Sequence, residues 1–191
     1  PYWGCIPSKM AIRAATVLEE SRRVGALAGS STTTPDWGIV ASRIRNEATD
    51  DWNDQVAVDR FTGNGGTFVR GYGKIIGPRV VEVDGVRYTA TKALVTKAAI
   101  PPIPGLDTVP FWTNREALKS REVPESLVVL GGGAIGCELA QVFNRFGSKV
   151  TIIEAAPRLI ALEEPEAGEI LAQSLTDDGI SVIVGVGAKS V

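Results

Sequence analysis

The chain of 191 residues contains no histidine, which excludes histidine-based acid–base catalysis by its own side chains. Its two cysteines, Cys5 and Cys137, are too few for a disulfide scaffold. Lysine and arginine number 20 against 22 aspartate and glutamate residues, and a net charge of -2 offers no basic field to nucleic acid. No apolar run approaches the roughly 20 residues of a membrane span, and no charged segment followed by an apolar core marks a secretory leader. We therefore expect a cytoplasmic protein with no nucleic-acid or membrane partner.

A glycine-rich motif is the most informative pattern in the chain. Gly131-Gly-Gly-Ala-Ile-Gly136 follows the apolar run Ser126–Leu130 and leads into a helix-like stretch. This order of strand, glycine turn and helix is typical of a dinucleotide fingerprint, in which the diphosphate lies at the helix N-terminus. Gly131 would permit the tight turn, Gly133 would let the diphosphate approach, and Gly136 would let helix and strand pack closely. The positions predicted to contact the cofactor are Gly131, Gly132, Gly133, Ala134, Ile135 and Gly136.

The next apolar run, Lys149–Ile153, is followed directly by Glu154. An acidic residue about 20 positions beyond such a motif grips the adenosine ribose hydroxyls in dinucleotide-binding folds. A carboxylate there accepts a hydrogen bond from a free 2′-hydroxyl and repels a 2′-phosphate, so NADH is favoured over NADPH. Arg158 lies nearby and would reach a phosphate if its loop turned it inward. The competing interpretation is a glycine turn in another α/β protein, with Glu154 merely solvated.

A second motif lies near the N-terminus, where Gly4-Cys-Ile-Pro-Ser-Lys9 opens a long helical pattern. Pro7 suits a first helical turn, because an N–H at that position would have no partner within the helix. A cysteine just before a helix lies at the positive end of the helix dipole, which stabilises its thiolate, and Lys9 adds a cation. Taken alone, Cys5 is better explained as a small packed residue.

Together these motifs resemble the pyridine nucleotide-disulfide oxidoreductases, the flavoprotein family that includes lipoamide dehydrogenase, glutathione reductase and mercuric reductase. Residues 4–9 are similar to the second half of the family's redox-active motif. The glycine motif, with Glu138 two places after it, is similar to the family's NAD(P)H motif. Residues 100–106 resemble the segment that crosses from the FAD domain into the NAD domain, so the resemblance extends over nearly the whole chain.

The resemblance implies an FAD-dependent oxidoreductase that passes hydride from NAD(P)H to the flavin and then to a disulfide and an acceptor substrate. Cys5 would be the redox cysteine closer to the flavin, with its partner five positions earlier, just before Pro1. Lys9 would lie near the flavin and pair with Glu138 at the nicotinamide, and Gly73 would leave room for the FAD adenine. Cys5, Lys9 and Glu138 are the implied catalytic residues, and no metal site is expected.

Several of these assignments have simpler alternatives. Glu138 is also explained as an exposed helix charge, and Gly73 as the site of a β-bulge. Two other functions stay open: a flavin-free NAD-linked dehydrogenase, which leaves the Cys5 motif unexplained, and a non-catalytic NAD-binding fragment. From the family we expect a small-molecule or small disulfide substrate, and a homodimer in the full-length protein.

The expected fold class is α/β, with part of an FAD-binding domain at residues 1–108 and the first half of a Rossmann-like NAD(P)-binding domain at 109–191. The family's first glycine fingerprint and its C-terminal interface domain have no counterpart in this sequence. The family's Ala-Thr-Gly signature is missing near Ala93–Lys97. We therefore expect an incomplete chain, either a fragment or a sequence with residues omitted.

Periodicity and turn signals predict the secondary structure in outline. Helices are predicted at residues 8–27, 37–56 and 165–177, and strands at 67–69, 74–76, 80–83, 86–89, 126–130, 149–153 and 180–184. Asp84-Gly85 is typical of a two-residue hairpin turn. Trp37 and Trp52 are expected to pack against helices rather than to bind a substrate.

Overall fold

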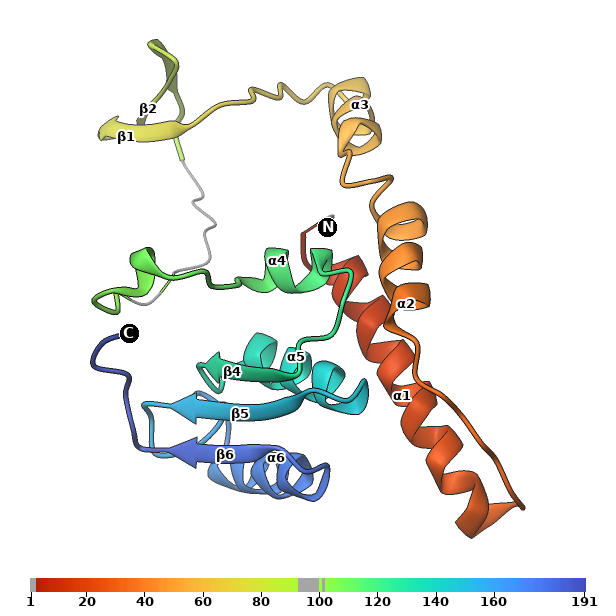
Figure 1. Ribbon diagram of the computed structural model, residues 1–191. Coiled ribbons are helices and arrows are strands. Elements are labelled where there is room, and N and C mark those ends of the chain that lie inside the picture. Colours follow the sequence, from red (N-terminus) through yellow and green to blue (C-terminus); the bar gives the residue numbers. More distant parts are fainter. Residues whose placement is uncertain (1–2, 93–99, 101) are drawn as a thin grey trace. The chain divides into compact units, whose positions relative to one another are not determined.

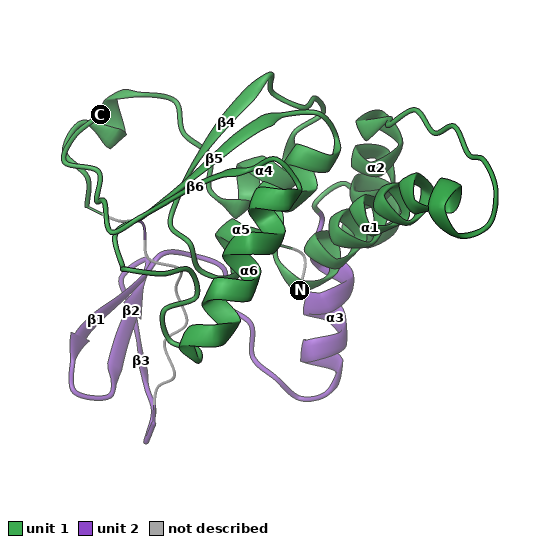
Figure 2. Cartoon of the chain, turned by 90° about the horizontal axis from the view of Figure 1, so that it is seen from below, with its two compact units in different colours: residues 1–52, 102–191 green, residues 53–101 purple. Residues whose placement is uncertain are grey.

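The computed structural model describes residues 3–92, 100 and 102–191 (Figure 1). The chain divides into two compact units, residues 1–52 with 102–191, and residues 53–101 (Figure 2). These units do not coincide with the predicted domains, 1–108 and 109–191. Compact units are not the same as the FAD- and NAD(P)-binding domains, so the predicted domain boundary stays a prediction. Residue 101 of the expected interdomain segment, and the region 93–99 to which the missing Ala-Thr-Gly signature maps, lie outside the described residues.

Three helical segments open the first unit. α1 spans Cys5–Leu27, α2 spans Trp37–Arg43, and η1, a π-helical turn, spans Ile44–Ala48. The side chain of Asp36 caps α2 by accepting a hydrogen bond from the Gly38 N–H at 2.8 Å. Among the helices that the structure describes, none is long and apolar enough to cross a lipid bilayer.

The helix predicted over residues 37–56 is interrupted, so this prediction is wrong at residues 49–54, between η1 and the next helix. Asp50, Asp51 and Trp52 adopt left-handed backbone conformations, with φ of 48°, 53° and 65°. The hydroxyl of buried Thr49 donates to the Arg45 carbonyl at 2.9 Å and accepts from the Trp52 N–H at 3.2 Å. A hydroxyl that bonds to nearby backbone groups competes with the helix in this way, and apolar periodicity does not reveal it.

The second unit contains α3, Gln55–Gly63, and an antiparallel sheet of β1, Gly73–Gly77, β2, Val80–Val83, and β3, Val86–Thr89. Asp84 and Gly85 join β2 to β3 with φ of 49° and 80°, which confirms the predicted hairpin. The strand predicted at 67–69 is wrong, because these residues are irregular. Glycines flank this short run on both sides, and it pairs with no described strand.

The rest of the first unit is a parallel α/β segment. Its elements are η2, Leu106–Thr108; α4, Asn114–Lys119; β4, Ser126–Leu130; α5, Ala134–Arg145; β5, Lys149–Glu154; α6, Pro165–Asp177; and β6, Ser181–Val184. The strands lie in the order β4-β5-β6, and Ile153 of β5 pairs with Leu130 and with Ile183. Alternating parallel strands and helices confirm the α/β class.

α5 carries much of the core of the first unit. Its Phe143 is fully buried and packs against Trp37 of α2, with ring centroids 5.1 Å apart. Trp37 also donates its indole N–H to the Ser120 carbonyl at 2.9 Å, so it is a packing residue as predicted. α1 packs against α5 as well, which brings the helix that begins at Cys5 to the helix that follows the glycine motif.

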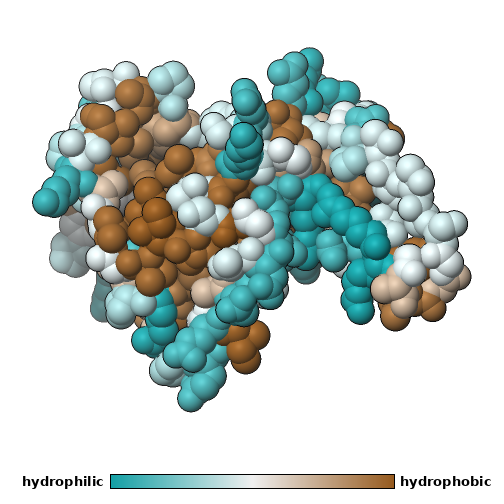
Figure 3. All heavy atoms as spheres, turned by 60° about the horizontal axis from the view of Figure 1, so that its bottom comes forward, coloured by the Kyte–Doolittle hydropathy of each residue, from teal (hydrophilic) through white to brown (hydrophobic). Residues whose placement is uncertain are grey.

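One face of the parallel sheet is covered by α5 and α6 (Figure 1). Leu127, Val129 and Val182 pack into the core under these helices. Residues that alternate with them point to the other face, and of these Val128 and Ile183 are 60% and 40% exposed. Both are among the large apolar side chains that stay exposed. Figure 3 shows a broad area of hydrophobic residues on one side of the molecule.

Candidate functional site

The glycine motif forms the turn from β4 into α5. Gly131 has a φ of 115°, which glycine adopts without a steric penalty. Its N–H donates to the carbonyl of Ile153 at 2.9 Å, so the first residue of the turn is hydrogen-bonded to the end of β5.

The other glycines of the motif have different surroundings. A Cβ atom on Gly136 would collide with the backbone carbonyl of Gly131, and one on Gly132 would collide with the Leu159 side chain. At Gly133, in contrast, no atom lies within 4 Å of the position that a Cβ would take. Gly132 and Gly136 are therefore required for close packing of the turn, and Gly133 leaves open space beside it.

The N-terminus of α5 presents backbone donors at this turn. Gly133 is the N-cap residue, no side chain accepts a hydrogen bond there, and the first turn contains no acidic residue. The N–H groups of the first helical turn have no acceptors within the helix, and the helix dipole adds positive potential. An N-terminus of this kind is typical of a phosphate site. The donors belong to Ala134, Ile135 and Gly136.

Glu154, the last residue of β5, is held against the glycine turn. One carboxylate oxygen accepts from the Gly132 N–H at 2.5 Å and the other from the Ala156 N–H at 2.6 Å. The side chain is only partly buried, and each oxygen keeps a further lone pair. A hydroxyl that approached the turn would meet an acceptor already fixed in position.

Arg158 is bonded to its own loop. Its Nη2 donates to the carbonyls of Ala161 and Glu163 at 2.8 and 3.0 Å. The sequence left open that the loop turns this guanidinium inward, toward a phosphate. In the structure its Nη2 is bonded to the carbonyls of the loop instead.

Cys5 is the first residue of α1 and carries an exposed, free thiol. Lys9 lies one turn further along the same helix and is exposed too. The segment before the thiol is fixed by Asn114, whose side-chain amide donates to the Trp3 carbonyl at 2.7 Å. The thiol is thus held at a fixed helix end and is open to a small molecule.

Glu138 lies in the second turn of α5 and is exposed. Although α1 packs against α5, no ion pair joins Lys9 to Glu138 among the described side chains. The predicted pairing of these two residues across bound cofactors therefore stays a prediction.

Cys137 is buried, whereas Cys5 is exposed. It is 3% exposed, and its Sγ donates a hydrogen bond to the Gly132 carbonyl at 3.4 Å. Burial raises the pKa of the Cys137 thiol to about 11, and the carboxylates of Glu154 and Glu138 add to the shift. Cys137 is a packed residue that stays protonated at neutral pH.

Gly73 opens β1 in the second unit, paired with Val83. A Cβ there would lie 3.3 Å from a methyl group of Val81, so close packing within the sheet is enough to explain a glycine at this position. The irregular pairing in this sheet lies between Ile75 and Gly77, so the β-bulge alternative for Gly73 is wrong. Its predicted contact with FAD stays a prediction.

Sequence reasoning missed an aromatic and cationic cluster beside the thiol-bearing segment. Trp3 stacks on Trp52 with ring centroids 4.8 Å apart, and Lys119 Nζ lies 4.5 Å from the Trp3 centroid. Arg115 lies over the same Trp3 ring at 5.0 Å. These residues come from distant parts of the chain, and periodicity within one segment carries no signal for such a contact.

The whole chain matches a known family. The family model described as pyridine nucleotide-disulphide oxidoreductase matches residues 1–191. Mercuric reductase from Bacillus cereus is 31% identical over 186 aligned residues, covering 95% of this chain and 29% of that protein. Dihydrolipoyl dehydrogenase from Chlorobaculum tepidum is 36% identical over 197 aligned residues, covering 96% of this chain and 40% of that protein.

A solved structure has a similar fold. The HOCl-induced flavoprotein disulfide reductase RclA from Escherichia coli has a TM-score of 0.69 at 27% identity, over 96% of this chain and 39% of that chain. The chain therefore spans well under half the length of the relatives it matches. With the match over its full length, the chain belongs to the pyridine nucleotide-disulphide oxidoreductase family.

Proposed function

We propose that this chain is part of an oxidoreductase that uses NADH and FAD to reduce a disulfide that includes Cys5, and through it a small acceptor. The observation that carries the proposal is the contact of Glu154 with the glycine turn, next to an uncapped α5 N-terminus. The exposed Cys5 thiol in the same compact unit supports the second half of the proposal. The membership of the family supports both.

The residues present fit a nicotinamide dinucleotide. The backbone N–H groups of Ala134, Ile135 and Gly136 would bind the diphosphate, and the open space beside Gly133 would admit it. The Glu154 carboxylate would accept hydrogen bonds from the adenosine ribose. Gly131, Gly132 and Gly136 would act indirectly, by giving the turn its shape.

The same loop favours NADH over NADPH. A 2′-phosphate would approach the Glu154 carboxylate, which repels it. Arg158, the cation that would compensate, donates instead to Ala161 and Glu163. For Arg158 to offer its Nη2 to a 2′-phosphate, these two hydrogen bonds would have to break.

When bound, the nicotinamide and the flavin supply the hydride chemistry. Cys5 would receive the reducing equivalents as one sulfur of a disulfide, and Lys9 and Glu138 would orient the two cofactors where they meet. The second sulfur does not come from Cys137, which is buried and bonded to Gly132. The residues present fit only part of an FAD site, with Gly73 as the predicted contact in the second unit. We further propose a homodimer in the cytoplasm as the working form of the full-length protein.

A visible absorption spectrum of the purified protein, before and after anaerobic addition of NADH, tests the proposal. A flavin band that bleaches, or that gains a long-wavelength charge-transfer shoulder, is the expected result, and the shoulder should be lost in Cys5→Ser. A colourless protein that still binds NADH would overturn the flavin-dependent function and favour a nucleotide-binding fragment. A colourless protein that oxidises NADH with a substrate would favour the flavin-free dehydrogenase.

A further inference from the structure

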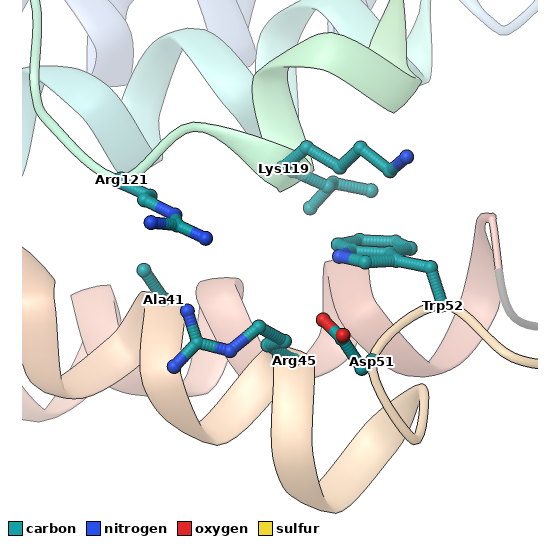
Figure 4. A pocket seen from close by; sticks show the side chains of 7 residues that line it. Ala41, Arg45, Asp51, Trp52, Lys119 and Arg121 are labelled. Atoms are coloured by element: carbon teal, nitrogen blue, oxygen red, sulfur yellow. The ribbon is translucent and has the colours of Figure 1, made fainter.

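The first unit contains a cavity lined by residues that the proposed function does not use. Its volume is about 200 Å³, and Figure 4 shows it between η1 with the turn that follows and the end of α4. The polar and aromatic side chains that line it are Arg45, Asp51, Trp52, Lys119 and Arg121. Three are cations and one is a carboxylate, so positive charge prevails around the cavity.

Two arginines face the same space. Figure 4 shows the side chains of Arg45 and Arg121 entering the same space from opposite walls, Arg45 from η1 and Arg121 from the segment after α4. Arg45 donates its Nε to the Asn46 side chain at 3.2 Å, which leaves its terminal N–H groups for another acceptor. Neither guanidinium forms an ion pair with a carboxylate of the described residues. The two like charges repel each other, and an anion between them would remove the repulsion.

Trp52 adds a neutral donor. In Figure 4 the edge of its indole ring that carries the nitrogen faces the two arginines. The ring is fixed because it stacks on Trp3 and because Lys119 Nζ lies 5.4 Å from its centroid. The indole N–H therefore points into the cavity without further ordering of the ring.

The backbone that forms this wall is held in place. The Asp51 N–H donates to the Arg45 carbonyl at 2.7 Å, and buried Thr49 donates to the same carbonyl. These bonds maintain the left-handed conformations of Asp50, Asp51 and Trp52. The turn that carries Asp51 and Trp52 is therefore held by its own hydrogen bonds, without help from a ligand.

The Asp51 carboxylate is the feature that opposes an anion. In Figure 4 it lies beside the aliphatic stem of Arg45 rather than between the two guanidinium groups. With three cations against one carboxylate, the lining keeps a net positive charge.

We propose that this cavity binds the phosphate group of a small molecule, with Arg45 and Arg121 as the charged donors and the Trp52 N–H as the third donor. Arginine guanidinium groups match phosphate oxygens in pairs, which a lysine ammonium does not. The proposal does not depend on the proposed function, because none of these residues belongs to the dinucleotide or thiol site.

Calorimetric titration of the purified protein with inorganic phosphate, and separately with phenyl phosphate, in a phosphate-free buffer of low ionic strength tests the proposal. We expect phosphate to bind in the cavity, and the variants separate this binding from any binding at the N-terminus of α5. Arg45→Gln and Arg121→Gln should each weaken binding at least about tenfold. Arg43→Gln is the matched control, because Arg43 already pairs with Glu47 and does not line the cavity.

A further variant distinguishes this cavity from the N-terminus of α5, which is also expected to attract phosphate. Gly133→Glu adds a carboxylate at the dinucleotide site and should leave phosphate binding in the cavity unchanged. Loss of binding in Gly133→Glu together with normal binding in the two arginine variants would overturn the proposal. Absence of binding to the unmodified protein would overturn it too. Circular dichroism of each variant shows whether the fold is retained, and Arg121 is exposed, so its replacement should not unfold the chain.

Discussion

The carboxylate of Glu154 accepts a hydrogen bond from the Gly132 N–H at 2.5 Å, which ties the end of β5 to the glycine turn after β4. The residue proposed to bind the ribose is therefore bonded to the turn that is proposed to bind the diphosphate. Glu154→Gln removes the charge and one acceptor oxygen. Because a hydrogen bond to a charged group contributes about 1.5–3 kcal/mol, we expect the Kd for NADH to rise about tenfold or more.

In Glu154→Gln the Kd for NADPH should come closer to the Kd for NADH, because the amide no longer repels a 2′-phosphate. Calorimetric titration with NADH and with NADPH measures both effects. Glu125→Gln serves as the control, since Glu125 is exposed and precedes β4. An unchanged ratio of the two dissociation constants in Glu154→Gln would contradict the assigned role.

Substitution by alanine should affect stability at Gly136 and NADH binding at Gly133. Gly136→Ala places a methyl group against the Gly131 carbonyl, which is backbone and cannot turn aside. We expect a loss of about 1–3 kcal/mol in unfolding free energy, measured by urea denaturation. Gly133→Ala meets no atom, so the unfolding free energy should hardly change while NADH binding weakens, because the methyl group occupies the space proposed for the diphosphate. Equal stability losses in both variants would contradict this account.

The sequence predicted the parallel half of the fold well because each signal there is local. A strand, a glycine turn, a helix and a second strand ending in Glu154 follow one another closely, and the structure has them in that order. The pattern also located Gly136 as the point of close helix–strand packing. A pattern of this kind is read from residues that are close in sequence, because the glycines of the turn mark positions where the backbone has to bend or pack closely.

The errors arose where a contact depends on a single polar group or on distant segments. Apolar spacing continued from Trp37 to Val56, but the Thr49 hydroxyl bonds to the backbone of η1 and ends the helix. The stack of Trp3 on Trp52 has no local signature at all. The cavity lined by Asp51 and Trp52 depends on the end of this helix and on the tryptophan stack, so the sequence did not predict it.

The two cysteines should differ sharply in alkylation. At neutral pH, iodoacetamide should modify Cys5, which is exposed, and leave Cys137 unmodified, because its thiol is buried and has a raised pKa. Mass spectrometry of peptides after a timed reaction measures the two rates, and addition of urea should make Cys137 reactive. Modification of Cys137 at the rate of Cys5 in the native protein would contradict the structure.

The start of α4 offers a test of local stability. Thr113 and Glu116 form a capping box, in which the Thr113 hydroxyl accepts from the Arg115 N–H at 3.2 Å and Glu116 accepts from the Thr113 N–H at 2.7 Å. Thr113→Ala should lower the unfolding free energy by about 1 kcal/mol, and Thr113→Ser, which keeps the hydroxyl, by much less. Thermal denaturation of the three proteins side by side measures the difference, and equal losses in both variants would mean that the methyl group rather than the cap is responsible.

Cys137 should make the protein less stable in alkali. Burial raises the pKa of its thiol from 9.0 to about 11, so between these values the folded chain holds a proton that the unfolded chain has lost. Stability from this group is complete below pH 9 and declines as the pH rises toward 11, by roughly 2–3 kcal/mol in all at 1.36 kcal/mol per pKa unit. The measurement is the difference in unfolding free energy between the unmodified protein and Cys137→Ala as the pH is raised, because contributions that the two proteins share cancel in it. That difference should shrink above pH 9, and a difference that stays constant up to pH 11 would show that the thiol does not titrate with a raised pKa.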